Sequence, residues 1–501
     1  MTTLLTTPGQ AAMWLHDRVR GSLRTDSRRL AAGDGFIAWP GAAVDGRTFV
    51  ASALTAGAGA CLVEHEGAGK FDLKGERVAT YVGLKAATGP IAAAYFEAPG
   101  RHLNVIAVTG TNGKTSTTWL LAQALGKLER KCGVMGTLGI GEPGAMVPNG
   151  LTTPDPVLLQ GQLRRFVDEG FSACALEASS IGIVERRLDA VPISIAMFTN
   201  FTQDHLDFHG SMQAYWEAKQ SLFAWTGLKA AIINIDDPKG LELEASLGGS
   251  GLNIWTFSCS DSGTSARLQA RNLVYADGGL TFNVVEAGRS HALVTHMVGQ
   301  YNVSNLLGVM AALRAMGFAL ADVVAACHDL LPVPGRMDTL ALTGCPLAVI
   351  DYAHTPDALE KVLAALQPVA AGRRGQLWCV FGCGGDRDRA KRPLMAAVAE
   401  KNSDRLVVTS DNPRTENPLA IIGEIVAGLT LCEEAITEPD RAKAVALALN
   451  LAAAEDVVLL AGKGHEKFQE INGQKFPFSD RAHAQATLSA RLAAAPIGSL
   501  A

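Results

Sequence analysis

Residues 104–116 read NVIAVTGTNGKTS, and this stretch decides how the chain folds. Its first five residues, 104–108, are mostly apolar and β-branched, which predicts a buried strand. The turn 109–113 follows, with glycines at 110 and 113, and Lys114 begins a helical pattern. A strand, a glycine turn and a helix N-terminus in this order indicate a phosphate-binding loop, because glycines let the backbone approach a polyphosphate and the helix dipole attracts its charge.

Two side chains of this loop carry chemistry. Lys114 can reach the terminal phosphates of a nucleotide, and the Thr115 hydroxyl can ligate Mg²⁺. The loop is shorter than G-x-x-x-x-G-K-[ST], which would need glycine at Val108. A glycine turn with a solvated lysine is the alternative, and the flanking strand and helix favour the phosphate loop. The candidate phosphate-binding residues here are Gly110, Thr111, Asn112, Gly113, Lys114, Thr115 and Ser116.

The composition bounds the class of protein. With 501 residues, 48% of them hydrophobic, the chain is long enough for three compact domains. A net charge of -5 and the absence of a long like-charge run argue against a nucleic-acid surface. The nine cysteines are scattered, without a C-x-x-C pair, which favours buried thiols in a reducing compartment. The N-terminus does not resemble a signal peptide and no apolar run reaches about 18 residues, so we expect a soluble cytoplasmic protein without membrane insertion.

The first hundred residues predict a small α/β domain. Short strands are expected at 35–39, 59–64 and 78–82, with helices at 11–20, 47–56 and 89–97. The Pro99-Gly100 pair stops the last helix and marks the first domain boundary.

The middle of the chain repeats one arrangement, an apolar strand that runs into polar residues. Strands are predicted at 174–176, 193–198 and 230–233 beside the strand that precedes the phosphate loop. Ligands of an open parallel sheet lie at the carboxyl ends of its strands, so the polar residues that follow should converge on the phosphates held by Lys114. Glu177 and His205 become candidate Mg²⁺ ligands, with a structural role as the alternative for His205.

Three further polar groups are candidates in the middle domain. Thr152 and Thr153 lie in a polar loop that could bind a phosphate or a sugar. Lys219 has apolar and aromatic neighbours; it could extend its ammonium to solvent, or, if desolvated, lose its proton and react with CO₂ to give a carbamate. Asn302 opens an apolar helix and could cap it or contact a base.

The prolines and glycine of 331–336 break the helical pattern and mark the second boundary. Strand-then-helix alternation restarts beyond it, with strands at 347–350, 377–381, 406–408 and 457–460, which predicts a second doubly wound sheet. Its strand ends carry charges of both signs. Arg387 and Arg414 can each grip a carboxylate, and Asp411 and Glu466 can receive an ammonium group, which describes a pocket for a zwitterionic amino acid.

These motifs together resemble one family. The runs TGTNGKTS, EASS, TNFTQDHLDFHG, DYAHTPDALE, FGCGGDRDRAKRP, SDNPRTENP and LAGKGHEKFQ, in this order over nearly the whole chain, are similar to those of the Mur ligases of peptidoglycan synthesis. The resemblance implies an α/β protein of three domains: a small N-terminal α/β domain over 1–100 that binds a UDP-sugar peptide, a central P-loop ATPase-type domain over 101–334, and a C-terminal Rossmann-like domain over 335–501 that binds an amino acid.

The resemblance also assigns residues. It implies ATP binding at Gly110 to Ser116, with Asn302, Arg336 and Asp351 near the nucleotide. It further implies Mg²⁺ held through Thr115, Glu177 and His205, and Lys219 as a carbamylated lysine; Lys114, Glu177, His205 and Lys219 form the catalytic set. For the UDP-sugar peptide it implies Thr25, Ser27, Ala42, Ala43, Val44, Thr152, Thr153, Ser179, Glu185 and Arg187. For the amino acid it implies Arg387, Asp411, Asn412, Pro413, Arg414, Gly462 and Glu466. Ile181, Glu185 and Asn417 stand where the family usually has histidine, glutamine and aspartate.

The implied activity is an ATP-dependent amide ligase. We expect the protein to be a monomer, although no sequence motif bears on its oligomeric state. It would join meso-diaminopimelate to UDP-N-acetylmuramoyl-L-alanyl-D-glutamate through an acyl phosphate. The Asp411-Asn412-Pro413-Arg414 run resembles the family's diaminopimelate signature, and a bidentate contact from Arg414 of roughly 1.5–3 kcal/mol would discriminate against lysine about 10- to 150-fold. The alternatives are a lysine-adding homologue, the related folylpolyglutamate synthetase, and, from another class, a non-catalytic nucleotide switch.

Overall fold

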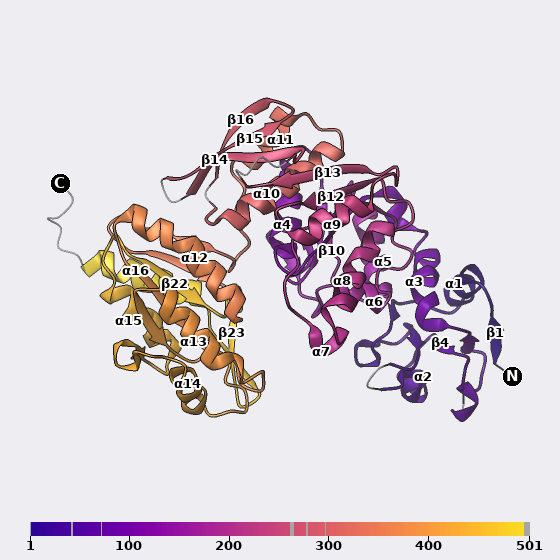
Figure 1. Ribbon diagram of the computed structural model, residues 1–501. Helices are drawn as coiled ribbons and strands as arrows, with labels where there is room; N and C mark the ends of the chain where they lie inside the picture. Colours follow the sequence, from indigo (N-terminus) through magenta and orange to yellow (C-terminus); the bar gives the residue numbers. More distant parts are fainter. Residues whose placement is uncertain are drawn as a thin grey trace. The chain divides into compact units, whose positions relative to one another are not determined.

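The structure is a computed structural model that describes residues 2–41, 44–71, 73–260, 265–276, 279–295 and 297–494 (Figure 1). The chain divides into two compact units. The first consists of Met1–Gln269, Val285–Arg289 and Ser304–Cys327, and the second of Ala270–Val284, Ser290–Val303 and His328–Ala501. Three sheets of mostly parallel strands, connected by helices, confirm the predicted α/β fold class.

The first unit begins with a five-stranded parallel sheet in the order β1-β5-β4-β3-β2. Its strands are β1 (Thr3–Leu5), β2 (Leu23–Arg24), β3 (Gly35–Ala38), β4 (Ala60–Glu64) and β5 (Val78–Tyr81), and its helices are α1 (Pro8–His16), α2 (Val50–Thr55) and α3 (Leu84–Tyr95). Neighbouring residues of one strand face opposite sides: Ile37 packs in one buried cluster and Phe36 in the other. Both faces are therefore covered, which is why these strands read as continuous apolar runs.

Two helices of this domain begin earlier than their patterns predict. α1 starts at Pro8 because the Thr7 side chain accepts a hydrogen bond from the Gln10 N–H and caps the helix. α3 starts at Leu84 and continues through Pro90, whereas the sequence suggested a start at Gly89. The predicted start was therefore wrong, and Pro90 lies inside the helix.

The second sheet is built around β6 (Asn104–Thr109). Its order is β16-β15-β14-β13-β12-β11-β6-β10-β7-β8-β9. The central strands β13, β12, β11, β6, β10 and β7 run parallel to one another. At one edge, β8 is antiparallel to β7 and β9 is antiparallel to β8. The remaining strands are β7 (Cys132–Gly136), β8 (Gly139–Glu142), β9 (Ala145–Val147), β10 (Ala173–Glu177), β11 (Ile193–Phe198), β12 (Ala230–Asn234), β13 (Asn253–Ser258), β14 (Leu268–Ala276), β15 (Gly279–Glu286) and β16 (Arg289–Thr295).

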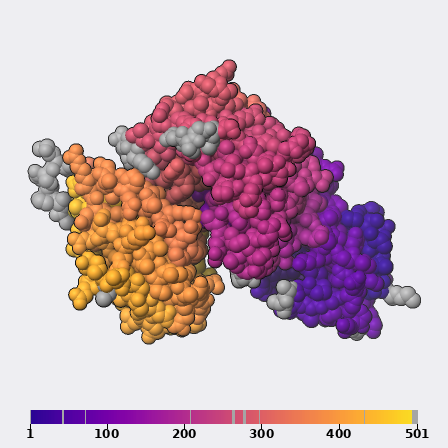
Figure 2. Space-filling model, viewed as in Figure 1, coloured from indigo at the N-terminus to yellow at the C-terminus, as the bar shows by residue number. Residues whose placement is uncertain are grey.

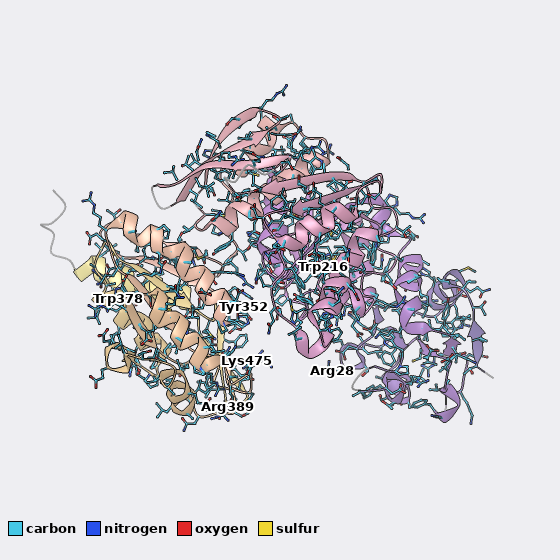
Figure 3. The ribbon with its side chains drawn as sticks, in the orientation of Figure 1. Arg28, Trp216, Tyr352, Trp378, Arg389 and Lys475 are labelled. Carbon is cyan, nitrogen blue, oxygen red and sulfur yellow. The ribbon has the colours of Figure 1, made fainter. Side chains whose placement is uncertain are left out.

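The helices of this part are α4 (Lys114–Lys127), α5 (Pro156–Asp168), α6 (Ser180–Val184), α7 (Leu206–His209), α8 (Met212–Gln220), α9 (Pro238–Ser246), α10 (Gln300–Ala315) and α11 (Leu320–Cys327). Trp216 of α8 packs edge-on against Phe198 of β11, with 5.4 Å between ring centroids (Figure 3). The N-terminal sheet and this one join through a tight contact, because a Cβ on Gly89 of α3 would lie 2.5 Å from the Asp189 carbonyl oxygen. In Figure 2 the N-terminal part of the chain is indigo and the middle part is magenta.

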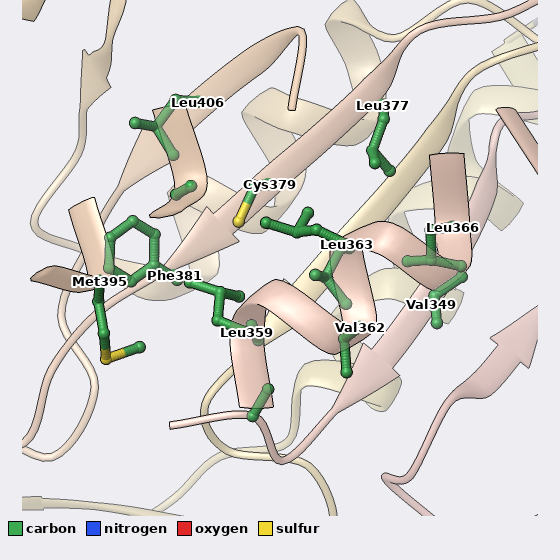
Figure 4. Close-up of a cluster of buried hydrophobic side chains, with 14 of the residues drawn as sticks. Val349, Leu359, Val362, Leu363, Leu366, Leu377, Cys379, Phe381, Met395 and Leu406 are labelled. Carbon is green, nitrogen blue, oxygen red and sulfur yellow. The ribbon is translucent and has the colours of Figure 1, made fainter. Parts of the chain in front are cut away.

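The second unit holds a six-stranded sheet in the order β17-β18-β22-β19-β20-β21, parallel except for β17. Its strands are β17 (Asp338–Leu340), β18 (Leu347–Asp351), β19 (Leu377–Phe381), β20 (Arg405–Val408), β21 (Ile436–Thr437) and β22 (Val457–Ala461), and its helices are α12 (Pro356–Arg373), α13 (Lys391–Asn402), α14 (Pro418–Val426), α15 (Arg441–Leu451) and α16 (Asp480–Ala494). Leu359 and Leu363 of α12 pack with Cys379 and Phe381 of β19 on one face (Figure 4), and α15 and α16 cover the other.

A two-stranded hairpin, β23 (Phe468–Ile471) and β24 (Gln474–Pro477), follows the last strand of this sheet. Sequence reasoning did not find it. The hairpin reaches back to the loop after β20, because Arg414 donates its backbone N–H to the Glu470 carbonyl at 3.0 Å and its own carbonyl accepts from Asn472 at 2.6 Å. It therefore braces the segment in which the amino-acid pocket was predicted.

The described part of the chain contains no helix with the length and apolar character needed to cross a membrane. Every cysteine whose side chain is described is a buried free thiol, as expected.

A fully buried ion pair, Arg441–Asp480, ties the strands of the C-terminal sheet together. The guanidinium donates to both Asp480 oxygens at 2.8 and 2.7 Å and to the carbonyls of Ser410 and Ala461 at 3.2 and 2.8 Å. Those carbonyls directly precede Asp411 and Gly462. Arg441 thus fixes the ends of β20 and β22, where two predicted ligands begin.

We expect Asp480→Ala to lower the free energy of unfolding by about 3–5 kcal/mol, because it leaves the Arg441 charge buried and uncompensated. The neighbouring variant Arg481→Ala is the matched control: it removes an ion pair to Asp338 whose arginine is half exposed, and should cost about 1 kcal/mol or less. Urea unfolding followed by circular dichroism measures both. If both variants lose the same amount of unfolding free energy, burial does not make the Arg441–Asp480 pair more important for stability than an exposed pair.

Candidate active site

The glycine turn of the predicted phosphate loop lies between β6 and α4, as expected from the sequence. Gly110 and Gly113 have φ values of +145° and +85°, a backbone conformation that glycine adopts readily. A Cβ at Gly110 would collide with the Thr199 hydroxyl, and one at Gly113 would lie 2.6 Å from the Asn305 side-chain oxygen. These two positions therefore need glycine both for conformation and for space.

Residues at the end of β11 hold this loop in shape. The Thr199 hydroxyl donates to the Asn112 carbonyl at 2.6 Å, and the Asn200 side chain accepts from the Asn112 N–H at 2.8 Å. The Thr111 hydroxyl donates to the Thr202 carbonyl at 3.0 Å. The loop is thus pre-formed, which reduces the entropy lost when it binds a ligand.

Lys114 curls back over the loop. Its ammonium donates to the carbonyls of Gly110 and Thr111 at 2.9 and 2.8 Å. The positive charge therefore stands beside the loop and the N-terminus of α4, where the helix dipole also favours an anion. Ser116 lies in the first turn of the same helix.

Glu177 ends β10, and its carboxylate is almost fully buried. It accepts hydrogen bonds from the Thr115 hydroxyl at 3.0 Å, the Thr137 N–H at 2.8 Å and the Thr137 hydroxyl at 3.2 Å. Residue pairing puts Glu177 beside Val108 in the sheet, so the ends of β6 and β10 meet as expected. Sequence reasoning missed Thr137, although its place directly after a strand was a usable signal.

The oxygen donors of Thr115 and Glu177 suit Mg²⁺, which prefers hydroxyl, carboxylate and water ligands. His205 is half exposed in its side chain, has a φ of +50°, and pairs with Asp204 at 3.4 Å. Across the residues described, no group of three or more His, Cys, Asp and Glu side chains is arranged to hold a metal ion. The role of His205 stays a prediction.

Lys219 is buried and does not extend to solvent. Its ammonium donates to the Gly110 carbonyl at 2.8 Å and lies 4.4 Å from the Tyr215 ring centroid. Burial, together with the nearby charge of Lys114, lowers the pKa of Lys219 well below its usual 10.5. Of the two alternatives for Lys219, an ammonium extended to solvent or a desolvated amine, the structure favours the second. A partly neutral amine can act as a nucleophile toward CO₂.

The buried Lys219 makes stability depend on pH. Its pKa is lower in the folded chain than in the unfolded one, so the unfolded chain binds more protons between those two values. Compared with Lys219→Met, the wild type should gain unfolding free energy as pH rises through this window toward 10.5, by at most about 1.4 kcal/mol per pH unit. Urea unfolding of both proteins in CO₂-free buffer at several pH values measures the difference. If the unfolding free energies of the wild type and Lys219→Met change with pH in the same way, Lys219 is not a buried, partly neutral amine.

Three of the residues predicted for the sugar peptide come together. The Thr153 hydroxyl donates to the Glu177 carbonyl at 2.8 Å and lies 2.8 Å from the Ser179 hydroxyl, and Arg187 donates to the Thr153 carbonyl at 3.0 Å. Burial lowers the pKa of Arg187. Thr152 contacts Thr137 at 3.1 Å, so this group adjoins Glu177.

The other sugar-peptide candidates are scattered. Thr25 and Ser27 flank Asp26, which caps a short 3₁₀ turn, and Val44 is exposed. Ala42 and Ala43 lie outside the described residues. Glu185, one of the three positions that differ from the family, follows α6 and forms an ion pair with Lys85 of α3 at 2.7 Å. This ion pair links the N-terminal domain to the middle domain.

The predicted amino-acid residues of the second unit gather at the ends of β20 and β22. Asn412 donates its side-chain N–H to Glu466 at 2.8 Å, and Asp411 packs against Gly462, where a Cβ would lie 2.6 Å from the Asp411 carboxylate. Lys463 was not assigned a role from sequence, yet it is fully buried here and donates to both Asn412 and Glu466 at 2.9 Å. Its place between two glycines after a strand was the available signal.

Arg414 has a φ of +52° and donates to the Gly385 carbonyl at 2.6 Å, with Glu470 3.6 Å from its guanidinium. Gly385 lies against Pro413, which leaves no room there for a Cβ. Arg387 is exposed on the same loop after β19. The loops that carry the two candidate arginines therefore touch.

A charge network locks these loops together. Arg392, fully buried, donates to both oxygens of Glu416 at 2.9 and 2.8 Å, and Glu416 accepts from the Asp386 N–H at 2.6 Å. The hydrogen bonds from Arg392 lower the pKa of Glu416 to about 2. Asn417, the third unusual position, caps α14 by accepting from the Leu419 N–H at 2.9 Å, so its amide does what an aspartate would do there.

The remaining nucleotide candidates belong to the second unit. Asp351 is buried and accepts from the N–H groups of Met337 and Ala353 at 2.7 and 2.8 Å; burial raises its pKa. The Arg336 guanidinium carbon lies 4.7 Å from the ring centroid of Tyr352, which is labelled in Figure 3. The Asn302 side chain donates to the Val298 carbonyl at 2.7 Å, which is a local role.

Family models match three successive parts of the chain. Residues 21–94 match the model described as Mur ligase family, catalytic domain, residues 108–313 the Mur ligase middle domain, and residues 335–464 the Mur ligase, glutamate ligase domain.

Individual proteins agree with these matches. A UDP-N-acetylmuramoyl-L-alanyl-D-glutamate--2,6-diaminopimelate ligase of Acidovorax sp. (strain JS42) is 55% identical over 494 residues, which is 97% of this chain and 98% of the relative. A solved structure with the same ligase name has a TM-score of 0.68 and 35% identity, over 94% of this chain and 95% of that one. The MurF ligase of Thermotoga maritima, solved in complex with ADP, shares the fold with a TM-score of 0.64 and 19% identity, over 94% of this chain and 98% of that one.

Proposed function

Because this chain belongs to the Mur ligase family, we propose that it is an ATP-dependent amide ligase that joins diaminopimelate to UDP-N-acetylmuramoyl-L-alanyl-D-glutamate. The observation that carries the proposal is the group of Asp411, Asn412, Arg414 and Glu466 at one edge of the C-terminal sheet. That edge offers carboxylates for an ammonium and a guanidinium for a carboxylate, in a chain that also has a phosphate loop.

The proposed division of labour follows the three sheets. Residues 1–100 would bind the UDP-sugar peptide, 101–334 ATP, and 335–501 the amino acid. Ser179 and Arg187 both contact Thr153 beside Glu177, and these three residues support a second part of the sugar-peptide site in the middle domain. Free cysteines support a reducing compartment such as the cytoplasm, and the monomeric state stays a prediction.

The chemistry would proceed in two steps. The side-chain carboxylate of the peptide's D-glutamate attacks the γ-phosphorus, the bond to the β-phosphate oxygen breaks, and ADP leaves. An uncharged amine of diaminopimelate then attacks the acyl carbon, the carbon–oxygen bond to phosphate breaks, and the amine gives up a proton as the amide forms. Lys114 and the N–H groups at the start of α4 would stabilise the charge on the phosphates.

Thr115 and Glu177 would hold Mg²⁺, with His205 as a further candidate ligand. A bound Mg²⁺ would neutralise phosphate charge as a Lewis acid. Lys219, whose buried amine has a lowered pKa, is proposed to add CO₂ and release a proton, which gives an N6-carboxylysine. ¹³C-bicarbonate labelling, followed by NMR of the wild type and Lys219→Met, tests that modification.

Turnover with defined substrates tests the proposed function. With ATP, Mg²⁺, the UDP-sugar dipeptide and diaminopimelate, we expect ADP and the UDP-sugar tripeptide in equal amounts, with ADP measured by a coupled assay and the tripeptide by mass spectrometry. Omission of either co-substrate should prevent sustained ADP release. Equal turnover rates with lysine and with diaminopimelate would contradict the proposed amine substrate. Turnover with a folate in place of the UDP-sugar dipeptide would favour folylpolyglutamate synthetase. ATP hydrolysis that only a protein partner stimulates would favour a nucleotide switch.

A further inference from the structure

Lys463 is a buried cation whose polar contacts all lie among the residues of the proposed amino-acid site. Its side chain has no exposed area, and its ammonium lies 2.9 Å from Asn412 Oδ1, 2.9 Å from Glu466 Oε2 and 3.8 Å from Asp411 Oδ1. The rings of Phe468 and Phe478 also lie near it, each with its centroid 5.9 Å from the ammonium.

These contacts settle which way the Asn412 amide points. Its Oδ1 accepts from the Lys463 ammonium and from the Glu470 backbone N–H, both at 2.9 Å. Two donors require an oxygen at that position, so the amide nitrogen must face Glu466, to which it donates at 2.8 Å. Lys463 therefore fixes Asn412 as a donor toward the site.

Charge counting gives Lys463 a second effect. The carboxylates of Asp411 and Glu466 lie 3.8 and 2.9 Å from the Lys463 ammonium, so Lys463 compensates one of their two formal negative charges. The remaining single negative charge matches one ammonium group of an amino acid. Without Lys463, two carboxylates would share one site and repel each other.

We propose, on the basis of the function proposed above, that Lys463 is a positioning residue that determines how the ligase binds its amino-acid substrate. It sets the net charge of the ammonium subsite and holds Asn412 and Glu466 in their binding orientation. It acts through these side chains and does not touch the reacting atoms.

The substitution Lys463→Ala tests this role. We expect the KM for diaminopimelate to rise roughly 30-fold or more, since loss of one member of a buried charge pair leaves the other unpaired. The KM values for ATP and for the UDP-sugar dipeptide should change little. Lys467→Ala, which removes an exposed lysine four residues further on, is the matched control and should leave all three KM values unchanged.

Chemical rescue separates positioning from folding. n-Propylammonium has the atoms that Lys463→Ala removes, so it should lower the KM for diaminopimelate back toward the wild-type value, and n-propanol should not. If Lys463→Ala does not accumulate in folded form, Lys463→Arg keeps the charge and should raise the KM for diaminopimelate alone, by a smaller factor. An equal rise in all three KM values, or an unchanged KM for diaminopimelate, overturns the proposal. A wild type that does not use diaminopimelate at all would instead overturn the proposed function.

Discussion

Lys114→Ala should reduce ligase turnover by at least about 10²- to 10³-fold, the cost of removing one preorganised group that stabilises transition-state charge. In the structure the Lys114 ammonium stands over the glycine loop, held by the carbonyls of Gly110 and Thr111. Transfer of the γ-phosphoryl group spreads negative charge over its oxygens, and this ammonium is the cation of the loop placed to meet it. Release of ADP that depends on both co-substrates measures the effect.

The control for this variant lies on the same helix. Lys127 is the last residue of α4 and is exposed, so Lys127→Ala should keep wild-type turnover. Circular dichroism of both variants should match the wild type, which checks that the overall helix content is unchanged. Turnover that survives Lys114→Ala would remove the phosphate loop from the chemistry.

Arg414→Ala should remove most of the preference for diaminopimelate over lysine. Diaminopimelate carries a second carboxylate that lysine does not have, and a charge-assisted contact to it is worth roughly 1.5–3 kcal/mol, or about 10- to 150-fold in kcat/KM. The Arg414 guanidinium is already oriented by the Gly385 carbonyl at 2.6 Å, so little side-chain entropy remains to be lost on binding. We therefore expect kcat/KM for diaminopimelate to fall by that factor while the value for lysine changes little.

Arg389 provides the matched control for Arg414. It is an exposed arginine in the neighbouring loop and pairs with Glu424 (Figure 3). Arg389→Ala removes the same charge without touching the pocket, so both kcat/KM values should stay at their wild-type level. If Arg389→Ala and Arg414→Ala lower the diaminopimelate value equally, general electrostatic attraction explains the preference and a specific contact does not.

Local patterns were sufficient for the parts of the fold where one element dictates its own structure. The run 104–116 predicted β6, the loop and the start of α4, because a short apolar run, two glycines and a lysine each act over a few residues. The convergence of Glu177 on Thr115 also followed, since parallel strands present their carboxyl ends at one edge.

Features that depend on distant residues were not predictable in this way. Lys463 stands in a motif that was visible, but its burial depends on Asp411 and Asn412 some fifty positions earlier. The partner of Arg441 is Asp480, and neither residue stands out in its own segment. Lys219 shows the limit most clearly: its sequence neighbours allowed both an exposed and a buried ammonium, and only the packing of α8 against the glycine loop decides between them.

A crystal structure of the protein with ADP, Mg²⁺ and diaminopimelate tests the central claim most directly, because that claim assigns one ligand to each of two strand edges. The account predicts the ADP phosphates on the N–H groups of residues 110–116, and the distal carboxylate of diaminopimelate within about 3 Å of the Arg414 guanidinium. Diaminopimelate bound away from Asp411, Asn412 and Arg414, or a nucleotide bound away from Lys114, would contradict it.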